Sequence, residues 1–101
     1  MLMELKVVPL GRGRSGSADL AGVLKIIDSS GLDYRLTATG TNVEGSWDQL
    51  LNVARQCHAE MRKKTERVVT SMMIDDYGDR SGRLAAMVES VEKKVGKPLK
   101  K

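Results

Sequence analysis

Four segments of the chain alternate between apolar and polar side chains, which is typical of strands with one buried face. The first spans residues 2–10 and the second residues 32–39, while the short third segment, 41–44, follows Gly40 and returns as a hairpin. The fourth, 67–76, is apolar on both faces apart from two hydroxyl residues. Strands of that kind are usually central in a sheet covered on both sides, so we expect a central position for it.

Three further segments carry apolar residues at helical spacing. The first begins at Ser17 and ends at Gly31, which can take the left-handed conformation. The second begins with the capping box Ser46-Trp47-Asp48-Gln49, and the third follows Ser81 as its N-cap and ends at Gly96. The three apolar stripes are Leu20, Val23, Leu24 and Ile27; Leu50, Val53, Ala54, Cys57 and Met61; and Leu84, Met87 or Val88, Val91 and Val95.

The order of these segments predicts an α+β fold. Strand, helix, strand, strand, helix, strand, helix gives a ferredoxin-like βαββαβ sandwich with a four-stranded antiparallel sheet and an additional C-terminal helix. Two helices cover one face of such a sheet, so one apolar set of the fourth strand needs cover from the third helix and from a second subunit. We therefore expect a homodimer or homotetramer. Residues 1–96 are predicted to form a single domain and residues 97–101 a basic C-terminal tail.

The net charge of +4 on this 101-residue chain is concentrated at its C-terminal end. Five of the 17 basic residues are lysines within residues 93–101, so residues 1–92 hold 12 basic against 13 acidic residues. A lysine tail of this kind is typical of a solvated terminus. Aromatic residues make up only 3% of the chain, so the core must be aliphatic and small, and oligomerisation often completes such a core.

The chain offers little for catalysis or metal binding. Cys57 is the lone cysteine, which fits a reducing compartment, and its place on an apolar stripe indicates a buried structural thiol. His58 diverges from it by about 100° around the helix, so the two cannot act as nucleophile and base. We expect no enzyme activity, no metal site and no cofactor. Without an apolar run of ~18 residues or a secretory signal, the default location is cytoplasmic.

Candidate ligand-binding groups gather in two segments. Residues 11–16, with three glycines and two arginines, lie between a strand and a helix as phosphate loops do, but without the spacing of a nucleotide fingerprint. This loop suits an anion or a polar ligand, and a flexible solvated loop is equally consistent with it. Residues 40–48 hold Asn42, Glu44 and Trp47; the plainer interpretation is that Glu44 is a solvated strand residue and Trp47 a hydrophobic cap.

An ordered set of motifs extends over nearly the whole chain, from about Glu4 to Val95. It consists of Val8-Pro9-Leu10-Gly11-x-Gly13, Gly40-Thr41-x-Val43-Glu44-Gly45-x-Trp47-Asp48, His58, Arg67-Val68-x-Thr70 and Ile74-Asp75-Asp76. In this order the motifs resemble the thiamine-binding, YkoF-like family of small proteins. The resemblance implies a ferredoxin-like subunit that assembles through its sheets into dimers or tetramers. It also implies binding of thiamine, or of its hydroxymethylpyrimidine part, without chemical transformation.

Thiamine pairs a thiazolium cation with an aminopyrimidine. Glu44 can balance the cation, and Trp47 or Tyr34 can face it. The aminopyrimidine needs hydrogen-bond donors and acceptors, which hydroxyl, amide and backbone groups supply. The predicted ligand-binding residues are Gly11, Gly13, Ser15, Thr37, Thr39, Asn42, Glu44 and Trp47. We expect the first loop and the hairpin to meet at the same end of the sheet.

Two other functions stay open at this stage. One is an RNA-binding module on the same fold, which needs aromatic side chains on the open sheet face and a basic surface. The chain supplies one strand aromatic, Tyr34, on a body that is not basic. The other is a structural or regulatory oligomer without a ligand.

The sequence departs from the pattern of the family that it resembles at two places. In the first loop, Arg12 and Arg14 suit an anion or phosphate rather than a cation. Tyr77 stands where that family usually has arginine.

Overall fold

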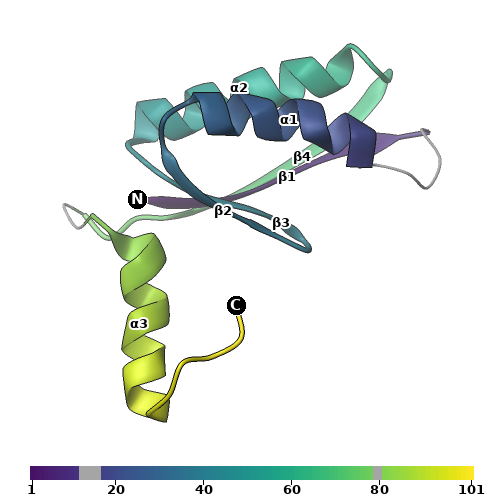
Figure 1. Ribbon diagram of the computed structural model, residues 1–101. Coiled ribbons are helices and arrows are strands. Elements are labelled where there is room, and N and C mark those ends of the chain that lie inside the picture. Colours follow the sequence, from purple (N-terminus) through teal and green to yellow (C-terminus); the bar gives the residue numbers. More distant parts are fainter. Residues whose placement is uncertain (12–16, 79–80) are drawn as a thin grey trace.

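A computed structural model describes residues 1–11, 17–78 and 81–101 (Figure 1). Gly13 and Ser15, two of the predicted ligand-binding residues, lie outside the described residues, as do Arg12 and Arg14. The elements are β1 (Leu2–Leu10), α1 (Ser17–Ser29), β2 (Asp33–Thr37), β3 (Gly40–Glu44), α2 (Trp47–Arg62), β4 (Arg67–Asp75) and α3 (Arg83–Val95). This order confirms the predicted ferredoxin-like βαββαβ fold with an additional C-terminal helix.

The four strands form one antiparallel sheet in the order β2-β3-β1-β4. β4 pairs with β1 over its full length, from Leu2 opposite Asp75 to Leu10 opposite Arg67. The predicted central position of β4 is therefore wrong, since β3 and β1 occupy the centre. β4 carries apolar side chains on both faces although only one face is covered by helices of its own chain. Val69 and Met73 on the other face are 44% and 59% exposed, and Met72, on the helix-covered face, is 47% exposed.

One face of the sheet packs against α1 and α2, which lie side by side above it in Figure 1. The register places the alternate residues of β1 on this face together with Val43 of β3. Their contacts with both helices form the aliphatic core. The core residues are Met3, Leu5, Val7, Val23, Ile27, Val43, Leu50, Val53, Ala54, Cys57 and Met61. All five residues of the stripe predicted for the second helix are buried.

The local interactions of α2 explain why it forms as predicted. The Gln49 backbone N–H donates to the Ser46 hydroxyl at 3.2 Å, and the Ser46 backbone N–H donates to Gln49 Oε1 at 2.9 Å, so the capping box is complete. His58 Nδ1 lies 2.7 Å from the Thr70 hydroxyl and links α2 to β4. Cys57 is fully buried beside these contacts, and burial raises the pKa of its thiol to about 11.

α3 lies on the opposite side of the sheet and projects away from it (Figure 1). Of its apolar stripe, Leu84 is the buried member, whereas Met87, Val88, Val91 and Val95 are 39% to 53% exposed. The Cα radius of gyration, 14.9 Å, exceeds the roughly 13 Å typical of a compact chain of this length because α3 stands off the sheet.

The N-terminus of α3 departs from the sequence prediction. Gly82, with φ of +69°, occupies the N-cap position, and its residue type provides no side chain to cap the helix. Ser81 is therefore not the cap. The first helical amide, of Arg83, instead donates to the carboxylate of Glu44, the last residue of β3.

The C-terminal tail does not run straight into solvent. Gly96, with φ of +92°, ends α3, and the chain then turns back toward the sheet (Figure 1). The Leu99 backbone N–H donates to Glu92 Oε2 at 2.6 Å, and the Lys101 ammonium lies 2.8 Å from the same oxygen. These contacts hold the tail beside α3, although the Lys101 side chain stays 55% exposed. Within the described ranges, no helix combines the length and apolar character needed to cross a membrane.

Candidate functional site

A cleft separates α3 from the outer face of the sheet, meaning the face away from α1 and α2. Its larger cavity, about 730 Å³, lies between the β2–β3 hairpin and one side of α3, and a smaller one of about 270 Å³ lies over β1 and β4. Both are lined by Asn42, Leu84 and Val88, so we treat them together and name them the α3 cleft. Cavities of about 300–1,000 Å³ are the usual size for small-molecule sites.

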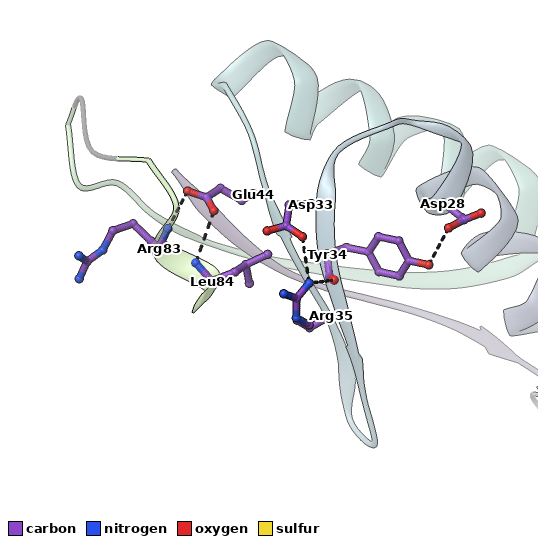
Figure 2. A network of polar contacts seen from close by, with 7 residues as sticks. All are labelled: Asp28, Asp33, Tyr34, Arg35, Glu44, Arg83 and Leu84. Atoms are coloured by element: carbon purple, nitrogen blue, oxygen red, sulfur yellow. Dashed lines mark hydrogen bonds and ion pairs between the residues drawn. The ribbon is translucent and has the colours of Figure 1, made fainter. Parts of the chain in front are cut away.

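Glu44 anchors α3, the helix that forms one wall of the α3 cleft. Its carboxylate accepts the backbone N–H of Arg83 at 3.0 Å and that of Leu84 at 3.4 Å (Figure 2). A carboxylate at this position satisfies amides that lack a partner within the helix and complements the positive end of the helix dipole. The acid predicted to face a ligand therefore holds α3 against β3, and its carboxylate oxygens are already engaged.

The N-terminal end of the α3 cleft is closed by a small cluster of polar side chains. The Arg83 guanidinium lies 4.7 Å from the centroid of the Tyr77 ring, and its Nη2 donates to the Met87 sulfur at 2.9 Å. A hydrogen bond to Asp75 raises the pKa of Tyr77. Arg83 Nε is buried and has no hydrogen-bond partner among the described residues. This end of the cleft thus combines a stacked cation with a carboxylate and a phenol.

Asn42 is the predicted site residue with the most central position in the α3 cleft. It lies in the middle of β3, opposite Glu4 of β1 and Arg35 of β2, and its side chain points to the outer face. It borders both cavities. No hydrogen bond of its side chain to another described residue is formed, so its amide can both donate to and accept from a bound molecule.

Thr37 and Thr39 lie at the tip of the β2–β3 hairpin. The Thr37 hydroxyl donates to the Gly40 carbonyl at 2.9 Å and accepts the Thr39 backbone N–H at 3.3 Å, so it serves the turn. Thr37 borders the α3 cleft, whereas Thr39 borders a separate cavity of about 210 Å³ beside α1, which Thr37 also lines. The hairpin tip is thus divided between two hollows.

The remaining predicted residues lie apart from one another. Glu44 is near the N-terminal end of β1, where it pairs with Leu2, while Gly11 follows the opposite end of the same strand. The expectation that the first loop and the whole hairpin segment meet at one end of the sheet is therefore wrong for Glu44 and Gly11. Trp47, at the first turn of α2, is 52% exposed and borders neither cavity of the α3 cleft.

Tyr34 faces the helices and not the outer face of the sheet. Its hydroxyl donates to Asp28 Oδ1 of α1 at 2.8 Å, and this bond raises the pKa of Tyr34 (Figure 2). Its neighbour Arg35 points to the outer face, where its guanidinium binds Asp33 at 2.9 Å and the Tyr34 carbonyl at 2.7 Å. The strand aromatic required for base stacking in an RNA-binding module is therefore turned away from the open face.

The helical wall of the α3 cleft was not predicted as part of a site. It brings in three apolar residues, Leu84, Ala85 and Val88, and two acids, Glu89 and Glu92, with Lys101 of the tail beside them. The signal for this wall was present in the sequence as an amphipathic stripe beginning at Leu84. The stripe predicts that this helix covers part of the sheet face left open by α1 and α2, but a helical pattern does not reveal that a cleft remains between the helix and the sheet.

Residues 3–92 match the thiamine-binding protein family. The chain belongs to this family. Among curated relatives, the UPF0045 protein sll0230 of Synechocystis is 33% identical over 93 residues, covering 91% of this chain and 77% of the relative. The UPF0045 protein YqgV of Bacillus subtilis is 33% identical over 98 residues, covering 91% of this chain and 94% of the relative.

Solved structures share the fold of this chain. The crystal structure of MJ1052 from Methanocaldococcus jannaschii has a TM-score of 0.84 at 25% identity and covers 91% of this chain and 95% of its own. TM0486 of Thermotoga maritima is described as a candidate thiamine biosynthesis/salvage protein. It has a TM-score of 0.73 at 21% identity and covers 92% of this chain and 96% of its own. The latter likeness concerns the fold alone.

Proposed function

We propose that this protein binds thiamine, or the hydroxymethylpyrimidine part of it, in the α3 cleft and does not transform it chemically. Membership of the thiamine-binding family is the observation that carries the ligand class. The position of Asn42, which borders both cavities of the cleft and has no polar partner among the described residues, supports the location. We further propose that the protein acts in the cytoplasm, where its buried lone thiol stays reduced.

The chemistry of the α3 cleft suits an aminopyrimidine joined to a cation. Asn42 offers a donor and an acceptor for the pyrimidine edge, and the side chains of Leu84 and Val88 offer an apolar wall for its ring. Glu89 borders the larger cavity and forms no hydrogen bond or ion pair with another described residue, so its carboxylate is available to a thiazolium ring. Glu44 contributes by holding α3 in place.

We infer that two or more copies assemble through the outer face of the sheet. Val8 and Val69 lie opposite each other in the β1–β4 register on that face, and they are 45% and 44% exposed. Apolar side chains at this level of exposure, one of them on the edge strand β4, favour burial against a second copy. Sedimentation velocity should show an oligomer that Val69→Lys dissociates and that Gln56→Lys, on the exposed surface of α2, leaves intact. A monomeric wild-type protein would contradict the inference.

Isothermal titration calorimetry with thiamine, hydroxymethylpyrimidine and thiamine monophosphate tests the proposed ligand. Asn42→Ala should weaken binding about tenfold or more, because a hydrogen-bonding pair is lost in a desolvated cleft. The matched control is Asn52→Ala, which removes the same side chain from the surface of α2, where it borders a different groove. Absence of binding by the wild-type protein at millimolar ligand would overturn the proposed function, and equal loss in the two variants would overturn the location.

A further inference from the structure

The tail, residues 97–101, is attached to one acid of the α3 cleft. Glu92 Oε2 accepts the Leu99 backbone N–H at 2.6 Å and the Lys101 ammonium at 2.8 Å, and the Glu92 carbonyl accepts the Gly96 N–H at 2.8 Å. Gly96 supplies the left-handed backbone that starts the turn, and Pro98 restricts the chain that follows. The turn is therefore specified by residues within α3 and the tail themselves.

The same contacts put a cation of the protein at the border of the proposed binding site. Lys101 and Glu92 both border the larger cavity, and the Glu92 side chain is only 16% exposed. Of the charged residues that border this cavity, two are basic, Arg35 and Lys101, and two are acidic, Glu89 and Glu92. Withdrawal of Lys101 leaves the cavity with a net negative charge, which a cationic ligand prefers.

We propose that the tail is a latch, in which Lys101 occupies the Glu92 carboxylate as a built-in cation and must leave before a bound cation can use that acid. The proposal rests on the function proposed above and adds a determinant of charge selectivity to it. With the latch closed, the cleft disfavours a second cation. With the latch open, Glu92 and Glu89 together face the thiazolium ring. Binding of a neutral aminopyrimidine does not require this exchange.

The contacts of the tail agree with a role for one particular lysine. Glu92 holds its carboxylate in the charged form, because the hydrogen bonds from Lys101 and from the Leu99 amide lower its pKa. Lys100 is exposed, borders neither cavity of the α3 cleft and makes no ion pair with another described residue. Two lysines of the same tail thus differ in position although they carry the same charge.

Calorimetric titration of thiamine compares these two lysines directly. Lys101→Ala should bind thiamine about twofold to fivefold more tightly than the wild-type protein, the range for removal of one largely exposed competing ion pair. Lys100→Ala removes the same charge and should leave the affinity unchanged, and hydroxymethylpyrimidine, which lacks the thiazolium cation, should bind all three proteins equally. Equal thiamine affinity of the two variants would overturn the latch.

A readout without ligand separates failure of the latch from failure of the proposed function. Hydrogen exchange of the Leu99 amide should be slow in the wild-type protein and at least tenfold faster in Glu92→Ala, while Glu89→Ala leaves it slow. Fast exchange in the unliganded wild-type protein would overturn the latch whatever thiamine does. If no protein binds thiamine, the proposed function fails, and the charge-selective role of the latch fails with it.

Discussion

α2 and α3 are both amphipathic helices with an apolar stripe, yet the fold treats them differently. The whole stripe of α2 is buried, and its N-terminus is capped by its own neighbours Ser46 and Gln49. α3 buries Leu84, leaves most of its stripe half-exposed and receives its cap from Glu44, about forty positions earlier in the chain. α2 is therefore part of the hydrophobic core, whereas α3 is an attached element that forms one wall of the α3 cleft.

Truncation of one apolar residue in each helix should give the largest difference in the free energy of unfolding between α2 and α3. Leu50→Ala, on the buried stripe of α2, should lower the free energy of unfolding by about 2–5 kcal/mol because it leaves a cavity in the core. Val91→Ala, on the half-exposed stripe of α3, should lower it by less than about 1 kcal/mol. Urea denaturation at low protein concentration measures both. Similar losses in the two variants would show that α3 belongs to the core.

Removal of each helix cap should distinguish the two helices, and a lost N-cap typically costs about 1 kcal/mol of unfolding free energy. Ser46→Ala removes a local cap of α2 and should reduce global stability by roughly that amount. Glu44→Ala removes the distant cap of α3, so the amides of Arg83 and Leu84 should exchange rapidly while the exchange of α2 stays slow. Hydrogen exchange measured by mass spectrometry distinguishes the two. Accelerated exchange throughout the protein in Glu44→Ala would contradict a separately attached α3.

Alkaline pH should reduce the stability of the hydrophobic core, to which α2 contributes the buried Cys57. The folded-state pKa of Cys57 is raised from 9.0 to about 11, so the folded state keeps the thiol protonated when the unfolded chain has begun to ionise. This contribution to stability is present below pH 9 and is lost as the pH rises toward 11. In Cys57→Ala the fall in unfolding free energy over that window should be smaller. An identical fall in both proteins would contradict burial of the thiol.

Acid should produce the smallest effect, and it should be confined to α3 and the tail. The pKa of Glu92 is lowered by its hydrogen bonds to Lys101 and Leu99, so this stabilisation is present above the ordinary glutamate pKa. It is lost as the pH falls through the lower folded-state value. Nuclear magnetic resonance should show the Leu99 amide losing protection in that window while Cys57 of α2 is unaffected. Simultaneous loss at both positions would indicate global unfolding instead.

Sequence patterns predicted the elements well where the determining interactions are local. The capping box at Ser46, the alternation of β1 and the helical stripe from Leu50 to Met61 each depend on neighbours within a few residues. The ferredoxin-like order followed from them. Interactions between distant segments were not predictable in this way, and the wrong central position of β4 is an example. Apolar residues on both faces of a strand show that both need cover, but not that the chain itself provides it.

The candidate site was predictable only in part for the same reason. Asn42 and Thr37 do border the α3 cleft, and Glu44 acts on it indirectly. The placement of Glu92 and Lys101 at the α3 cleft depends on the turn after Gly96, which puts the tail beside the helix it follows. Composition indicated a basic tail, yet it carried no information on where a single lysine would bind.

The most direct test of the account is a titration of the isotopically labelled protein with thiamine, followed by nuclear magnetic resonance. Binding in the α3 cleft predicts the largest chemical-shift changes at Asn42, Leu84 and Val88, on both walls of the cleft. The groove between α1 and α2, bordered by Gln49 and Asn52, should show no comparable change. Shifts confined to that groove, or no shifts at millimolar thiamine, would contradict the account.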